Sequence, residues 1–256
     1  MFHHKRFVAA LATEQIGRAF QYQPVVGSTM DVARTAAQDG APHGYTVLAD
    51  EQTAGRGRFA RRWIAPAGAN LTFTILVRPD RAVLERLSIV AALAVAGGVQ
   101  RVTGVEPRFK WPNDVHVDER KLAGILVEAA YIGDTPAFAL VGIGLNVNAE
   151  TSTVAEISAI AVSLRDLLGV PVEREPLLAA VLASFEYWYE RASEGQIVDD
   201  WAARLTTIGR QITVSFAGTI EHGVAESVTE SGALCLRRTD GTVVVLPAGE
   251  VTTQLT

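Results

Sequence analysis

The stretch Gln52-Thr53-Ala54-Gly55-Arg56-Gly57-Arg58, followed shortly by Trp63, is the part of the sequence around which the rest is organised. Two arginines alternate with two glycines, so the backbone can reach positive φ values and approach a ligand closely while two cations face one space. Guanidinium groups match carboxylate and phosphate oxygens, and a glycine-rich turn adds backbone N–H donors. The stretch predicts an anion-binding loop, with a solvated surface turn as the alternative.

The composition is that of a globular protein with no global attraction for polyanions. The chain has 256 residues, 48% of them hydrophobic, and a formal net charge of -5. Any basic site must therefore be local, and neither a nucleic acid nor a membrane is expected as a partner. Cys235 is the only cysteine, which excludes an intramolecular disulfide and a Cys-cluster metal site. A reducing, cytoplasmic location fits this cysteine usage.

The N-terminal segment carries basic residues before a short apolar run at 7–12, which Thr13 ends too early for a secretory signal. We therefore expect no export signal. No window approaches the roughly 20 apolar residues that a membrane span needs.

Hydrophobic patterning and turn residues predict alternating helices and strands over the first 207 residues. Ser28 or Thr29 is placed to cap the second helix, and Gly97-Gly98 in the third is expected to pack closely against a sheet. The expected helices are 7–18, 30–38, 84–102, 157–168, 175–192 and 197–205, and the expected strands are 20–26, 45–49, 71–77, 107–111, 115–117, 121–129 and 137–141.

The pattern changes beyond Gly209 to short apolar–polar alternations, with turns at Ser231-Gly232 and Asp240-Gly241. Expected strands are 212–216, 223–228, 233–237 and 243–246, which indicates a small all-β barrel. We place the domain boundary so that residues 1–207 form one domain and residues 208–256 the other.

Four further segments place polar groups at strand ends, as the Gly/Arg stretch does. They are Ser28-Thr29, Lys110-Trp111-Pro112-Asn113-Asp114, Lys121-Leu122-Ala123-Gly124-Ile125-Leu126-Val127-Glu128 and Gly142-Ile143-Gly144-Leu145-Asn146-Val147-Asn148.

These five segments, in this order, resemble the catalytic core of biotin protein ligases. The resemblance implies an α+β fold: a mixed-sheet catalytic domain of the biotin/lipoate ligase type followed by a small SH3-like β-barrel. It also implies a two-step reaction, in which biotin and Mg²⁺-ATP form biotinyl-5′-AMP and the biotinyl group then passes to a lysine of a biotin carboxyl carrier protein. Joining two anions requires several cations at one point, and the motifs supply four.

The resemblance also implies a role for each matching residue. Arg58, Lys110 and Lys121 are the implied catalytic residues. The implied biotin-binding residues are Ser28, Thr29, Met30, Gln52, Arg56, Gly57, Arg58, Trp63, Lys121 and Gly124. The implied ATP-binding residues are Gly55, Arg56, Arg58, Lys110, Asn113, Asp114 and Asn146. No resident metal is expected, because His43, His116 and His222 lack metal-ligand spacing.

Each role has a structural alternative. The alternative for Ser28-Thr29 is a helix cap, and the alternative for Lys121 is a solvated strand end. The alternative for residues 110–114 is a structural turn with Trp111 in the core. Trp63 also reads as packing, and the glycines at 142 and 144 as close strand contacts. The sequence departs from the family at Met30, where asparagine is usual, and at 59–60, where some members are more basic.

Three other functions compete with the ligase reading: a lipoate-type ligase, a nucleic-acid-binding module and a non-catalytic biotin sensor. The bifunctional members of the family carry an N-terminal helix-turn-helix domain, for which the 27 residues before Ser28 leave no room, so we expect no operator binding. A homodimer is possible through an exposed strand edge near 125–131.

Overall fold

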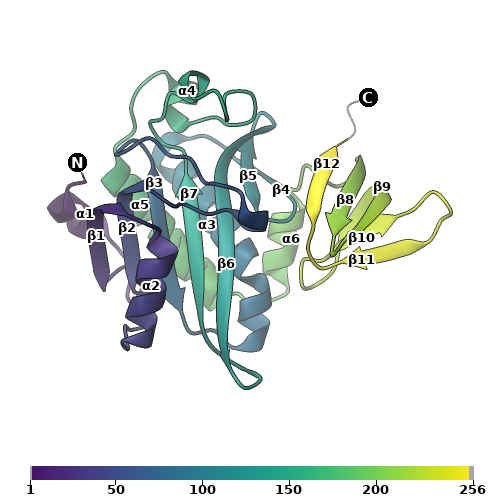
Figure 1. The fold of residues 1–256 in the computed structure, drawn as a ribbon, viewed down its shortest axis with the longest axis horizontal. Helices are drawn as coiled ribbons and strands as arrows, with labels where there is room; N and C mark the ends of the chain where they lie inside the picture. The colour runs from purple at the N-terminus through teal and green to yellow at the C-terminus, as the bar shows by residue number, and fades with distance from the viewer. Residues whose placement is uncertain (1, 254–256) are drawn as a thin grey trace.

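The computed structural model describes residues 2–253, and its largest element is a seven-stranded mixed sheet in the order β1-β2-β3-β7-β6-β5-β4 (Figure 1). The β1–β2 pair is parallel and every other neighbouring pair is antiparallel. The strands are β1 (Phe20–Val26), β2 (Thr46–Gln52), β3 (Leu71–Val77), β4 (Arg108–Lys110), β5 (Asp114–Val117), β6 (Arg120–Ile132) and β7 (Thr135–Leu145). The predicted α+β class with a mixed sheet is confirmed.

The central strands are buried on both faces, which explains their continuous apolar sequences. Helix α2 (Thr29–Gln38) packs on one face, where Met30 and Ala33 meet Leu76 and Leu140. Helices α3 (Arg81–Thr103) and α5 (Arg174–Glu190) cover the opposite face, where the core includes Ile75. Figure 1 shows α2 in front of the sheet with α3 and α5 behind it.

The glycine pair in α3 allows close contact with another helix, and the expected contact with a sheet is wrong. A Cβ at Gly98 would lie 2.7 Å from the backbone nitrogen of Val181, and one at Gly97 would lie 2.6 Å from Oγ of Ser184. Both neighbours belong to α5. The two helices therefore approach as closely as their backbones allow.

Helix α3 is also long and apolar enough to cross a membrane by length and composition, so the expectation that no segment approaches such a span needs correction. Its 18-residue window has a mean hydropathy of 1.8, but 61% of that window is buried inside the protein. Contact with α5 and the sheet accounts for its apolar character.

Two expected helices are shorter than predicted. The helix predicted at 7–18 is α1 (His4–Ala10), because the next segment donates three backbone N–H groups to the Glu186 carboxylate at 2.7–2.9 Å. The helix predicted at 157–168 is α4 (Leu164–Leu168), which starts at a capping box between Ser163 and Asp166. The remaining helices are α6 (Gln196–Ala202) and the 3₁₀ turns η1 (Arg58–Ala60) and η2 (Thr151–Thr153).

The C-terminal region is the predicted small β domain, an antiparallel sheet in the order β11-β10-β9-β8-β12. Its strands are β8 (Gln211–Phe216), β9 (Thr219–Val228), β10 (Leu234–Arg237), β11 (Val243–Leu246) and β12 (Glu250–Thr253), the last of which the sequence reading missed. The two regions share a continuous hydrophobic core, and Nε1 of Trp111 donates to the carbonyl of Gly232 at 3.0 Å. The boundary between 207 and 208 stays a prediction.

Candidate active site

A cavity of about 400 Å³ lies between the N-terminus of α2, the loop after β2, the β5–β6 hairpin and the start of β12. This volume falls within the range of about 300–1,000 Å³ that is usual for small-molecule sites. The sequence-predicted residues that line it are Ser28, Thr29, Met30, Gln52, Arg56, Gly57, Arg58, Trp63, Lys110, Asn113, Asp114, Lys121, Gly124 and Asn146. Gly55 is not among the lining residues.

The charge of the lining favours an anion. Six basic side chains face two acidic ones, in a protein whose overall charge is negative. The basic residues are Arg56, Arg58, Arg61, Arg62, Lys110 and Lys121, and the acidic ones are Asp114 and Glu250. The cations come from the loop after β2 and from two strands, so only the tertiary fold brings them together.

The end of the cavity at α2 is polar and ordered by hydrogen bonds. Ser28 caps α2, its Oγ accepting from the backbone N–H of Met30 at 3.3 Å. The Thr29 hydroxyl donates to Oε1 of Gln52 at 3.0 Å and accepts from the Thr74 hydroxyl at 2.8 Å. Ser28 and Thr29 are almost fully buried. Ser28 therefore both caps α2 and lines the cavity, whereas Thr29, the first residue of the helix, only lines it.

The Met30 side chain is part of the apolar wall of the cavity. It is buried in the cluster beneath α2, and a Cβ at Gly142 would lie 2.8 Å from its Sδ. An asparagine at this position would put an amide into that apolar cluster, where an unpaired polar group costs about 1–3 kcal/mol. Methionine therefore suits the environment that this chain provides.

The Trp63 indole packs against Gly144 and Gly124. A Cβ at Gly144 would lie 2.2 Å from Cε2 of the indole, and a Cβ at Gly124 would lie 3.1 Å from its Cζ3. The same Cβ at Gly124 would meet Nζ of Lys121 at 3.0 Å. These glycines therefore make room for two protein side chains. Among the described residues, Nε1 of Trp63 is buried without a hydrogen-bond partner, and a Cβ at Gly144 would lie 2.7 Å from it, so this edge of the indole faces β7.

The Lys121 ammonium is held at the cavity by an acidic neighbour. Its Nζ lies 2.7 Å from Oδ1 of Asp114, and Nε2 of His116 lies 3.9 Å from Oδ2 of the same carboxylate. Burial acts to raise the pKa of Asp114, but His116 and Lys121 together lower the pKa below its ordinary value. Asp114 is therefore a carboxylate that orients Lys121.

Arg58 is the loop cation that points toward the β5–β6 side of the cavity. Its Nη1 donates to Oδ1 of Asn113 at 2.9 Å, and Nδ2 of Asn113 donates to the carbonyl of Ile125 at 2.7 Å. Burial lowers the pKa of Arg58, against the effect of the nearby Asp114 carboxylate. A half-buried guanidinium with one hydrogen bond to a neutral amide retains capacity for an anionic ligand.

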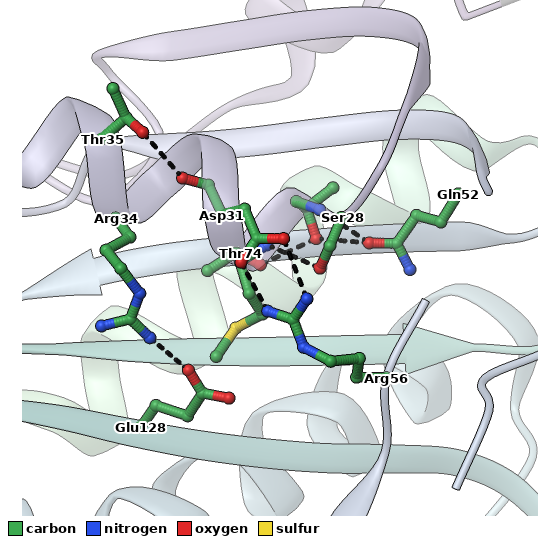
Figure 2. Close-up of polar contacts among 10 residues, drawn as sticks. Ser28, Asp31, Arg34, Thr35, Gln52, Arg56, Thr74 and Glu128 are labelled. Atoms are coloured by element: carbon green, nitrogen blue, oxygen red, sulfur yellow. Dashed lines mark hydrogen bonds and ion pairs between the residues drawn. The ribbon is translucent and has the colours of Figure 1, made fainter. Parts of the chain in front are cut away.

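Arg56 lines the cavity but is engaged on its outer side. Its Nη1 and Nη2 donate to Oδ2 and Oδ1 of Asp31 at 2.8 and 2.5 Å, a two-pronged contact to α2 (Figure 2). The bond to Arg56 is the main cause of the lowered pKa of Asp31. Any anion bound by the Arg56 side chain would share it with Asp31.

The other predicted residues differ in what their polar groups do. Lys110 is half-buried at the end of β4, next to the cavity. The side chain of Asn146 accepts from Asn70 at 3.2 Å and donates to the Lys121 carbonyl at 3.3 Å, so it braces the strand ends. The carbonyl of Gly55 accepts from the Trp63 N–H at 3.0 Å, which closes the base of the loop.

Sequence reasoning missed Asp31, His116 and Glu250 as neighbours of the site. Asp31 and Glu250 follow no motif, and only contacts across the fold reveal them. The segment predicted as a helix from 157 supplies Ile157 and Ile160 to the cavity wall instead. In the described part of the chain, no group of three or more His, Cys, Asp and Glu side chains is arranged to hold a metal ion.

The fold and the site define an α+β protein with a cavity lined mainly by basic side chains, and comparisons with known proteins specify its class. The family described as "Biotin/lipoate A/B protein ligase family" matches residues 22–146, and the one described as "Biotin protein ligase C terminal domain" matches residues 207–252.

Relatives of known name agree. The chain is 37% identical over 215 residues to a biotin--[acetyl-CoA-carboxylase] ligase of Paracoccus denitrificans, covering 80% of this chain and 88% of that protein. It is 32% identical over 237 residues to the bifunctional ligase/repressor BirA of Bacillus subtilis, covering 90% and 73%. A biotin protein ligase from Aquifex aeolicus in complex with biotin and ATP has the same fold, with a TM-score of 0.81, 23% identity and coverage of 93% and 100%. The chain belongs to the biotin protein ligase family.

Proposed function

We propose that this protein activates biotin with Mg²⁺-ATP and transfers the biotinyl group to a lysine of a biotin carboxyl carrier protein. In the first step a biotin carboxylate oxygen attacks the α-phosphorus of ATP, and pyrophosphate leaves. In the second, the lysine amine attacks the acyl carbon of biotinyl-5′-AMP and AMP leaves. The observation that carries the proposal is the convergence of Arg58, Lys110 and Lys121 on one cavity whose other end is polar and buried.

The polar end suits the ureido ring of biotin. A buried urea needs matched donors and acceptors, because each unsatisfied group costs about 1–3 kcal/mol. Ser28, Thr29 and Gln52 supply hydroxyl and amide groups there, and the Thr74 hydroxyl fixes the orientation of Thr29. The apolar Met30 side chain contributes to the wall beside them.

The basic end suits the acyl phosphate. Negative charge builds on the α-phosphoryl oxygens in the transition state, and fixed cations stabilise it without reorganising. We assign this role to Lys121, oriented by Asp114, and to Arg58, oriented by Asn113. Lys110 and Asn113 would face the remaining phosphates and their Mg²⁺.

Pyrophosphate exchange into ATP tests the first step. We expect exchange that depends on biotin and does not occur with lipoate. Exchange with lipoate alone would establish the lipoate-type alternative.

The Lys121→Ala variant separates a ligase from a sensor. Removing one preorganised cation typically lowers a rate about 10²- to 10³-fold, so exchange should fall by that factor while calorimetry still detects biotin. A non-catalytic sensor would bind biotin without any exchange in the unsubstituted protein.

The wider setting is part of the same proposal. The carrier protein is the partner, the location is cytoplasmic, and the two domains are 1–207 and 208–256. A homodimer is proposed through β6, whose ladder with β5 covers 120–124 and leaves the following residues open on that side, including the exposed Tyr131 and Ile132. Light scattering with and without biotin tests it.

A further inference from the structure

The segment 53–63, here called the Gly/Arg loop, is a closed hairpin over the cavity. Its backbone N–H of Gly57 donates to the carbonyl of Arg61 at 2.7 Å, and that of Trp63 donates to the carbonyl of Gly55 at 3.0 Å. Arg56 and Arg62 face each other as an antiparallel pair. These contacts join the two strands of the hairpin, so whatever holds the strands also determines where Arg58, at the tip, points.

The first strand of the hairpin is tied to α2. Both terminal nitrogens of Arg56 bind the carboxylate of Asp31 at 2.5 and 2.8 Å (Figure 2). Asp31 lies in the first turn of α2, two residues after Thr29 at the polar end of the cavity. A two-pronged contact fixes orientation as well as distance.

The second strand is tied to the C-terminal domain. Arg61 forms an ion pair with Glu250, the first residue of β12. Gly249, Glu250 and Val251 also line the cavity, so the contact closes the loop against a wall that the other domain supplies. The two ion pairs therefore attach one hairpin to two separate parts of the protein.

We propose that Asp31 and Glu250 are positioning residues, which hold the Gly/Arg loop closed so that Arg58 faces the cavity. Arg58 takes part in neither ion pair and donates instead to Asn113. The link to catalysis rests on the proposed function, whereas closure of the loop does not. Both ion pairs are partly exposed, so each shifts the population of open loop by only about two- to fivefold.

Trypsin measures loop opening directly, because the loop contains four arginines. We expect Asp31→Asn and Glu250→Gln each to raise the rate of cleavage at 56–62 about two- to fivefold, and the double variant to show the product of the two factors. Glu173→Gln is the matched control, since it makes the same change of charge in an exposed ion pair with Arg6, away from the loop. Mass spectrometry of the fragments assigns the cut.

Salt and charge reversal distinguish an ion pair from general loosening. Raising the salt concentration should speed cleavage of the unsubstituted protein relative to the double variant, because screening weakens exposed pairs. Exchanging the partners, Arg61→Glu with Glu250→Arg, should restore slow cleavage after Arg62. Asp31→Glu should restore most of the protection lost in Asp31→Asn.

Biotin-dependent pyrophosphate exchange then tests whether closure of the Gly/Arg loop affects the reaction. Because the open loop is the minor population in the unsubstituted protein, kcat/KM for ATP should fall in each variant by a smaller factor than the factor by which cleavage rises, and it should recover in Asp31→Glu. Cleavage rates in Asp31→Asn or Glu250→Gln equal to that of Glu173→Gln would overturn the proposal. Absence of exchange in the unsubstituted protein would instead refute the proposed function. The cleavage rates would still show whether the two ion pairs hold the Gly/Arg loop closed.

Discussion

Replacing Gly144 by alanine tests whether the close packing of Trp63 on Gly144 is needed for an active site of the right shape. The new Cβ would lie 2.2 Å from Cε2, 2.4 Å from Cζ2 and 2.7 Å from Nε1 of the indole. Ordinary contact begins at 3.4 Å, so the ring must retreat by about 1.2 Å. Gly144 lies within β7 and is not among the described glycines with positive φ, so the backbone itself accepts alanine.

Overpacking of this kind costs about 1–3 kcal/mol, and the cost falls on the loop that carries Trp63. We expect biotin-dependent pyrophosphate exchange to fall about 5- to 150-fold in kcat/KM, at about 1.4 kcal/mol for each factor of ten. The sheet is not strained, so Tm should change by less than about 4 °C.

The matched control is Gly27→Ala, which lies close to Ser28 and adds a methyl group with nothing within 4 Å. A second test adds Trp63→Ala to Gly144→Ala. If the clash is the cause, Gly144→Ala should cost little once the indole is absent, a coupling that a double-mutant cycle measures. Exchange by Gly144→Ala within twofold of Gly27→Ala would refute the reasoning.

Further predictions concern charge and packing. Asp114→Asn should lower the free energy of unfolding at pH 7. Because the pKa of Asp114 is lower in the folded state, this contribution is present above the unfolded value, 3.8, and is lost as the pH falls through the folded value. Urea denaturation at pH 7 and pH 3 should show the difference between variant and parent shrinking in acid, and an equal difference at both pH values would contradict it. Gly98→Ala should lower unfolding free energy by about 1–3 kcal/mol, because Val181 presents backbone that cannot move aside, and thermal denaturation measures it. An unchanged Tm would show that α3 and α5 can separate without cost.

The fold was largely predictable, because local patterns were strong where the sheet forms. The buried strands at 20–26 and 71–77 match β1 and β3 to the residue. The errors occur where tertiary contacts replace helical hydrogen bonds. The Glu186 carboxylate takes backbone donors that a longer α1 would have used, and the capping box at Ser163 starts α4 late.

The sequence predicted which residues line the cavity better than it predicted how their side chains are arranged. Motif residues such as Arg58 and Lys121 do line one cavity, although their roles remain predictions. No sequence pattern indicated that Arg56 would bind Asp31, or that Glu250 would reach the loop from the other domain. Such pairs depend on distances between elements far apart in the chain, which no local pattern encodes.

Transfer of biotin to a carrier tests the central claim most directly. The protein is incubated with biotin, Mg²⁺-ATP and a biotin carboxyl carrier domain, and the intact mass of the carrier is measured. Our account predicts one biotinyl addition, absent when the acceptor lysine is replaced. A carrier of unchanged mass, in a reaction where an established biotin protein ligase modifies it, would contradict the account.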